Sequence, residues 1–136
     1  MNIDKIYKML SWDNDISVQL CGIKEAQKIK SLWVFILPLL SSNSKSIWGN
    51  CAKILVSKSN SELKPYLTEL LKWLQDMNWP GASLMYDRLS SIPIDELELP
   101  LKICLDLANK TNDKPWENSL NALKNDTLKN SKNSSL

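Results

Sequence analysis

Three cysteines, Cys21, Cys51 and Cys104, are the side chains best suited to nucleophilic chemistry. A thiol nucleophile on the usual plan needs an adjacent base, most often histidine, and this chain contains no histidine. The missing histidine also removes the commonest general base and a main ligand of zinc, and no C-x-x-C pair is present. The sequence therefore predicts no catalytic residue, no metal site and no cofactor.

The acidic residues and the glycine spacing likewise predict no catalytic or phosphate-binding site. Asp95, Glu96 and Glu98 form an acidic cluster, but they follow Pro93 on a short connecting segment that we expect to be a solvated turn. Neither G-x-x-x-x-G-K-[ST] nor G-x-G-x-x-G occurs. We predict that the protein is not an enzyme, and chemistry by carboxylates ranks last among the alternatives.

The charge distribution argues against a nucleic-acid partner. The net charge is +2, the excess comes from residues 124–136, and Arg88 is the single arginine. A nucleic-acid binder concentrates basic side chains, usually including arginines, on one face. The alternative function is a HEAT-like nucleic-acid-binding or repair protein with a concave cleft. That function would require four lysines to converge on one side: Lys53, Lys58, Lys64 and Lys72.

The chain ends and the apolar runs indicate where the protein resides. The N-terminus lacks the layout of a signal peptide, and the longest apolar run, residues 32–40, contains Pro38 and is about half of a membrane span. The three cysteines are odd in number and far apart, which favours a reducing compartment. We predict a cytoplasmic protein with no membrane partner.

Apolar residues recur at three- and four-residue steps and nowhere alternate as in a strand, so the fold class is all-α. After the loop at residues 11–15, a helix should bury one face made of Ile16, Leu20, Ile23, Ala26 and Ile29. Another should begin at Pro80, and the segment after Pro100, apolar nearly all round, should be a central helix. We predict one domain over 1–125 and a disordered polar tail over 126–136.

Tryptophans recur near the expected helix starts. Trp12, Trp48, Trp79 and Trp116 are separated by 36, 31 and 37 residues, roughly one helical hairpin each. This degenerate repeat predicts a HEAT-like stack of helical hairpins, a short α-solenoid of about seven to eight helices with right-handed superhelical packing.

The segment LKWLQDMNWPGA at residues 71–82 resembles the signature of a bacterial family known only as domain of unknown function 5071. The stretches at residues 10–13 and 50–53 are similar to what surrounds that signature, and the resemblance reaches to about Asn125. It implies a small HEAT-like helical protein and carries no activity. Small helical proteins of this kind often serve as immunity proteins, which neutralise a toxin of the same bacterium.

Six residues are candidates for contact with a protein partner: Trp12, Asp13, Trp48, Asp76, Asn78 and Trp79. Exposed tryptophans beside carboxylates would anchor a partner, since aromatic residues dominate interface hot spots. The structural alternative is that Trp79 joins the Leu67–Leu74 helix to the following one, that Asp76 or Asn78 satisfies free N–H groups, and that Asp13 caps a helix. Trp48 and Trp116 are mainly core candidates. We predict a non-enzymatic protein-interaction module, in its concrete form an immunity-type protein that binds a toxin. The sequence gives no prediction of the oligomeric state.

Overall fold

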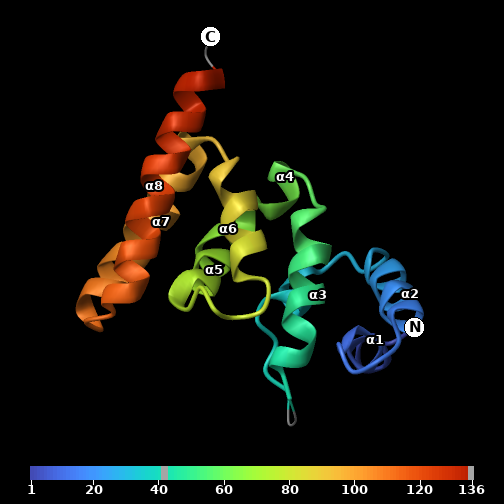
Figure 1. Ribbon diagram of the computed structural model, residues 1–136. Coiled ribbons are helices and arrows are strands. Elements are labelled where there is room, and N and C mark those ends of the chain that lie inside the picture. The colour runs from blue at the N-terminus through green and yellow to red at the C-terminus, as the bar shows by residue number, and fades with distance from the viewer. Residues whose placement is uncertain (41–42, 135–136) are drawn as a thin grey trace.

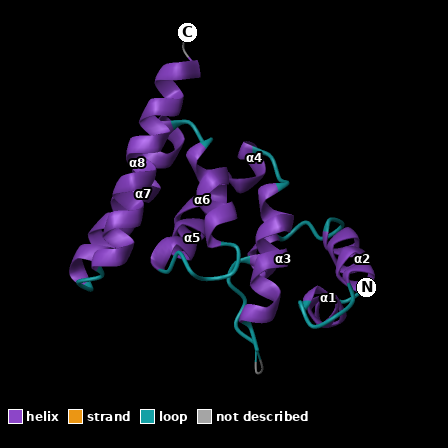
Figure 2. Ribbon diagram, viewed as in Figure 1, coloured by secondary structure: helices purple, strands orange, loops and turns teal. Residues whose placement is uncertain are grey.

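The computed structural model describes residues 1–40 and 43–134, and within these residues it is all helical, with loops and no strand (Figure 2). The α-helices are α1 Ile3–Leu10, α2 Ile16–Ala26, α3 Lys45–Val56, α4 Asn60–Leu63, α5 Leu67–Leu71, α6 Ala82–Ser90, α7 Ile94–Lys110 and α8 Lys114–Ser134. Three short 3-10 helices accompany them: η1 Leu32–Phe35, η2 Lys64–Tyr66 and η3 Lys72–Gln75. The prediction of an all-α fold is confirmed.

The helices follow one another across the molecule much as they do along the chain (Figure 1). The α1–α2 hairpin lies at one edge and packs on α3, α3 packs on α6, and α6 packs on α8. The α7–α8 hairpin closes the opposite side, with α5 against α7. This succession is consistent with stacked hairpins, while the right-handed superhelical sense remains a prediction.

Part of the core lies where η3 meets α3 through the rings of Trp73 and Trp48, whose centroids are 6.5 Å apart. Four leucines that recur at helical spacing, Leu67, Leu70, Leu71 and Leu74, are all buried, although the helix tightens from α5 into η3 partway along it. Trp73, within η3, is fully buried, and its Nε1 donates to the carbonyl oxygen of Pro80 at 2.9 Å. The core therefore reaches the turn that precedes α6.

That turn shifts the start of α6. The sequence predicts a helix beginning at Pro80, but α6 begins at Ala82, because Gly81 adopts a left-handed conformation with φ of +85°. A Cβ atom on Gly81 would lie 2.6 Å from the Cβ of Ala52 and 3.1 Å from the carbonyl oxygen of Trp48. Glycine at this position lets the turn approach the backbone of α3.

Two expectations about α7 are wrong. Asp95, Glu96 and Glu98 do not form a connecting turn, because the helix already begins at Ile94 and continues through Pro100. Proline removes one backbone hydrogen bond, and the helix on either side of it persists here. The helix is also not central: α7 packs on α5 and α8 with one side and exposes the other.

The polar C-terminal segment also differs from expectation. The sequence predicts disorder from residue 126, but α8 continues to Ser134, so this expectation is wrong for residues 126–134; residues 135–136 lie outside the described part. Thr127 is fully buried, the hydroxyl of Tyr86 donates to Asp126 Oδ2 at 2.5 Å, and Asn130 Nδ2 donates to the carbonyl oxygen of Ser90 at 2.9 Å. These contacts with α6 hold a segment whose composition alone is that of a disordered tail.

Candidate protein-binding surface

Two of the six predicted site residues belong to a tryptophan cluster made of Trp48, Trp73 and Trp79. Trp48 and Trp73 are buried and Trp79 is partly buried, and the ring of Trp48 meets the ring of Trp79 edge-on with centroids 5.3 Å apart. The Trp48 Nε1 group donates to the carbonyl oxygen of Pro38 at 2.9 Å. Trp48 and Trp79 therefore join α3 to the turn before α6, so Trp79 has a structural role, but the ring it meets belongs to α3 and not to the Leu67–Leu74 helix.

Asp76 and Asn78 shape the turn that carries Trp79. Asp76 Oδ1 accepts a hydrogen bond from the backbone N–H of Asn78 at 2.8 Å, and the backbone N–H of Trp79 donates to the carbonyl oxygen of Asp76 at 3.0 Å. Both side chains are exposed. Asp76 satisfies a backbone donor in this turn, which agrees with the structural alternative.

Trp12 has a different environment, because its backbone is fixed while its side chain is 53% exposed. Its N–H donates to the carbonyl oxygen of Ser46 in α3 at 3.0 Å. The surrounding loop is held by Asn14, whose Nδ2 donates to the carbonyl oxygen of Lys8 at 2.6 Å, and by Gln19, whose Nε2 donates to the carbonyl oxygen of Asn14 at 2.8 Å. Trp12 is therefore an aromatic side chain presented to solvent from an ordered loop.

Asp13 does not cap α2 as predicted. The N-cap of α2 is Asp15, whose side chain makes no capping hydrogen bond within the described residues. Asp13 instead turns back within the loop, where its Oδ2 accepts a hydrogen bond from the hydroxyl of Ser11 at 3.4 Å and its N–H donates to that hydroxyl at 3.3 Å. Its carboxylate lies in the wall of the groove described below.

The first half of α2 extends the exposed surface around Trp12. Ile16 is 63% exposed and Leu20 57% exposed, so the prediction that they face the core is wrong. The contact with α1 is made instead by Gly22, where an added Cβ would lie only 2.9 Å from the Cβ of Met9. Because this close approach turns the small residues of α2 toward α1, Ile16, Val18 and Leu20 are left exposed, whereas Ile23 is partly buried against the core. We call the exposed apolar set the N-terminal surface: Trp12, Ile16, Val18, Leu20 and Cys21.

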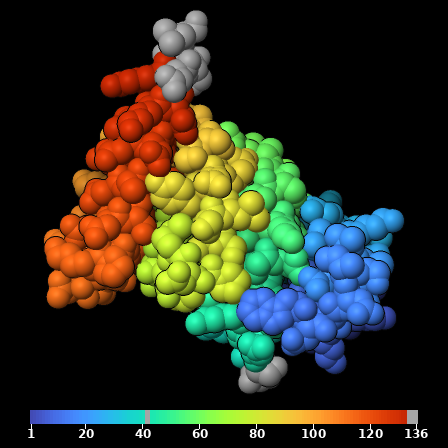
Figure 3. All heavy atoms as spheres, viewed as in Figure 1, coloured from blue at the N-terminus to red at the C-terminus, as the bar shows by residue number. Residues whose placement is uncertain are grey.

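Sequence periodicity missed this surface for a definable reason. Apolar residues occur on every side of α2, so the spacing of Ile16 and Leu20 does not distinguish an inner face from an outer one. The available signal was Gly22, since a glycine inside a helix often marks close approach of a second helix. The residues that form this edge of the molecule project as a distinct lobe (Figure 3).

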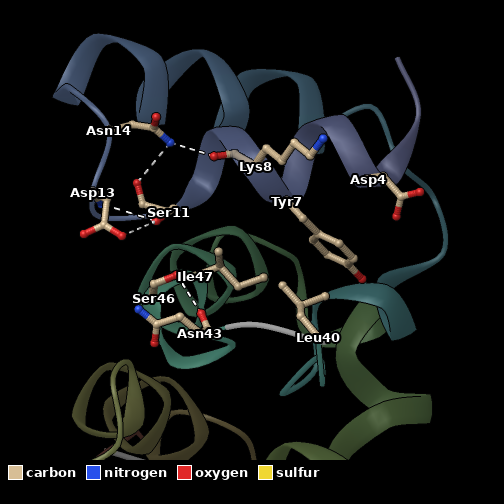
Figure 4. Close-up of a pocket in the computed structure, with 10 residues that line it drawn as sticks. All are labelled: Asp4, Tyr7, Lys8, Ser11, Asp13, Asn14, Leu40, Asn43, Ser46 and Ile47. Atoms are coloured by element: carbon tan, nitrogen blue, oxygen red, sulfur yellow. Dashed lines mark hydrogen bonds between the residues drawn. The ribbon is translucent and has the colours of Figure 1, made fainter.

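A groove of about 570 Å³ lies between α1, the loop after it and the start of α3. Leu40 and Ile47 supply apolar wall, and Asp4 and Asp13 lie toward its two ends (Figure 4). The hydroxyl of Tyr7 donates to the carbonyl oxygen of Val34 at 2.5 Å, and burial, with smaller effects of Cys51 and Asp4, raises the pKa of Tyr7. Lys8 also lines the groove and offsets one of the two carboxylates.

The described residues include two buried thiols and no cluster of metal ligands. No group of three histidine, cysteine, aspartate or glutamate side chains among them could hold a metal ion. Burial raises the pKa of the Cys51 thiol to about 12 and, as the largest of several effects, that of Cys104 to about 11, so both are protonated at neutral pH. A protonated, buried thiol is a poor nucleophile.

Two of the four lysines named for a nucleic-acid cleft lie near carboxylates. Lys64 lies 3.9 Å from Glu96 and Lys72 lies 3.0 Å from Glu69. Arg88 binds the C-terminal end of α3, with Nε donating to the carbonyl oxygen of Val56 at 3.2 Å and an Nη donating to that of Lys58 at 2.8 Å. The nucleic-acid alternative stays a prediction.

The fold and this surface define a small all-helical protein with an exposed apolar edge. None of the helices in the described part of the chain is both long and apolar enough to cross a membrane. The family model described as domain of unknown function (DUF5071) matches residues 49–136, and the chain belongs to this family. The match begins within α3, so the N-terminal surface lies outside it. No curated protein and no solved structure matches the chain.

Proposed function

We propose that the protein is a non-enzymatic binding module whose protein partner docks on the N-terminal surface. The observation that carries this proposal is the presentation of Trp12. Its side chain is exposed, while its N–H and its loop are tied to α3 and α1 by the hydrogen bonds described above. A partner that buries a fixed tryptophan loses little conformational entropy, which is why rigid aromatic residues act as anchors.

The neighbouring residues support the same use. Ile16 and Leu20 lie one helical turn apart and would be buried with Trp12 by a single partner surface. Large exposed apolar patches on monomeric proteins commonly mark interaction sites, and Ile16 and Leu20 on one face of α2 contribute exposed apolar surface. The groove adds two carboxylates, Asp4 and Asp13, at the rim, where they would pair with basic side chains of a partner.

In its concrete form the proposal is an immunity-type protein that binds and neutralises a toxin. The rim carboxylates favour a partner with a basic surface. The groove would then receive basic side chains while the apolar residues of α2 supply most of the affinity.

The test begins with affinity capture from the native cell and continues with the dissociation constant of the captured partner. Trp12→Ala should weaken binding at least tenfold, because truncating an anchoring tryptophan typically costs about 2 kcal/mol or more. The matched control is Leu128→Ala, which truncates an exposed apolar side chain on α8 and should leave binding unchanged. Equal affinities of the wild type and the Trp12→Ala variant would reject this surface.

The immunity-type form has its own readout. Expression of the captured partner alone should arrest growth, co-expression of the wild-type protein should restore growth, and the Trp12→Ala variant should restore it less. A partner that causes no growth defect would reject this form and leave the binding module in place.

A further inference from the structure

The exposed side of α7 carries a second line of apolar residues, far along the chain from the N-terminal surface. Leu99 is 65% exposed, Ile103 47% and Leu107 39%, at successive steps of four residues. We call these three residues the α7 stripe. The opposite side of the helix is buried against α5 and α8 through Leu97, Leu101, Cys104 and Ala108. A helix with two apolar sides has one side left for a further contact.

The residues along this stripe are arranged symmetrically about its centre in type and spacing, except that the charges at the two ends have opposite signs. Glu96, Leu99, Ile103, Leu107 and Lys110 are separated by three, four, four and three residues. The mean step is that of the heptad repeat, which keeps one seam facing a partner helix crossing at a shallow angle. Ile103 is the centre, a leucine lies on each side of it, and opposite charges stand at the two ends.

We propose that the α7 stripe binds a second copy of this chain, with the two α7 helices antiparallel about a two-fold axis at Ile103. In this arrangement Ile103 meets Ile103 of the other copy, and Leu99 meets Leu107. Glu96 meets Lys110, and two-fold symmetry makes this ion pair form twice. A parallel pairing would place Glu96 against Glu96 and Lys110 against Lys110, so the end charges select the antiparallel one.

The charged ends are suited to this pairing. The carboxylate of Glu96 is only partly buried and its ion pair with Lys64 is long at 3.9 Å, so the carboxylate can also accept a donor from another copy. Lys110 is exposed in the last turn of the helix. One pair of helices makes a small interface, and small interfaces are weak. We expect a dissociation constant in the micromolar range.

Sedimentation velocity of the full chain from about 1 to 500 μM tests the proposal through charge reversal. The variants Glu96→Lys and Lys110→Glu each place like charges at both ends of the seam, and each should self-associate at least tenfold more weakly than the wild type. In a one-to-one mixture, one copy carries a lysine at both end positions and the other carries a glutamate at both. Each end of the mixed seam then pairs a lysine with a glutamate, so the mixture should recover association to within about threefold of the wild type.

The controls and the refuting results follow from the same geometry. Lys102→Glu changes an exposed charge of α7 that is not part of the stripe, and it should leave association unchanged. Circular dichroism verifies that each variant is folded. A wild-type protein that is monomeric over the whole concentration range overturns the proposal. A mixture that stays monomeric while the wild type dimerises overturns the antiparallel arrangement.

Cross-linking gives a second measurement that does not depend on charge. In a Cys21→Ser background, Ile103→Cys places one thiol opposite its own copy at the two-fold axis. Treatment with diamide, which takes up the two electrons and two protons of the thiols, should give a disulfide-linked dimer. The control Lys102→Cys should stay monomeric, and equal linkage of the two variants would refute the axis. This surface is distinct from the N-terminal surface, so the Trp12→Ala variant should dimerise like the wild type.

Discussion

Replacing Gly81 by alanine tests the packing of the α6 turn against α3 most directly. The new methyl group would lie 2.6 Å from the Cβ of Ala52 and 3.4 Å from Nε1 of Trp73. Carbon atoms in contact normally lie about 3.5–4.0 Å apart, so the turn or α3 must shift by roughly 1 Å. The substitution also requires alanine to adopt the φ of +85° that Gly81 has.

The free-energy costs of the close contact and of the left-handed backbone can both be estimated. A non-glycine residue in the left-handed region costs about 1–3 kcal/mol, and overpacking a close-packed core costs about 1–3 kcal/mol. Alanine lowers the entropy of the unfolded chain, which returns about 0.4–1 kcal/mol. We therefore expect Gly81→Ala to lower the free energy of unfolding by about 2–5 kcal/mol, a large part of the stability of a domain of this size.

A double-mutant cycle separates the clash from the backbone strain. Ala52→Gly removes the methyl group that the new one would strike, at a cost of about 1 kcal/mol for glycine in a helix. The double variant should be more stable than the sum of the two single effects predicts, by about 1–2 kcal/mol, because the clash with the Ala52 methyl group is gone while the backbone strain and the close approach to the Trp48 carbonyl oxygen remain. Gly49→Ala is the matched control: its Cβ would meet nothing closer than Pro80 at 3.9 Å among the described residues, and it should stabilise α3 by about 0.5–1 kcal/mol.

Urea denaturation monitored by circular dichroism measures these free energies. The reasoning would be refuted by a Gly81→Ala variant as stable as the wild type. Additive effects in the cycle, within about 0.5 kcal/mol, would refute the contact between Gly81 and Ala52.

Four further predictions concern individual side chains and the cysteines. Thr127→Val should raise the free energy of unfolding by about 1 kcal/mol in urea denaturation, because the fully buried threonine hydroxyl has no hydrogen-bond partner within the described part of the chain. Arg88→Met should lower it by about 1–3 kcal/mol, because two carbonyl groups at the end of α3 lose their donor. In the native protein a thiol reagent at pH 8 should label only Cys21, and all three cysteines after unfolding, as counted by mass spectrometry. Because burial raises the folded-state pKa of Cys51 to about 12 and of Cys104 to about 11, the folded state keeps protons that the unfolded state loses, so stability should fall as pH rises from about 9 toward 12.

The spacing of apolar residues along the sequence predicted most of the helices, because the residues that face the core recur at helical intervals. The leucines from Leu67 to Leu74 and the buried Trp116 have the positions that their spacing predicts, and Asp113 accepts a hydrogen bond from the N–H of Trp116 at 3.2 Å as an N-cap should. In each case a large apolar side chain, or a capping side chain beside one, fixes the assignment.

The errors occur where contacts between distant segments outweigh local pattern. Residues 126–134 are polar, yet Asp126 and Asn130 find partners on α6 that no local rule can supply. The exposed position of Ile16 follows from the approach of α1 to Gly22, which depends on how two helices pack rather than on the sequence of either. Trp48 and Trp79 meet each other across 31 residues of chain, a contact that local spacing does not specify.

The α1–α2 hairpin is joined to the rest of the protein mainly along one seam with α3. Within that seam, the buried amide of Asn50 donates to the carbonyl oxygen of Leu10 at 2.7 Å and to Gln19 Oε1 at 3.0 Å. A unit attached along a single seam separates from the rest of the protein at a lower free energy than global unfolding requires. Its amide protons therefore exchange with solvent first. A molecule that contacts both Trp12 and α3 would hold this seam closed. Its binding would then slow amide hydrogen exchange in residues 3–26 before exchange changes elsewhere in the molecule.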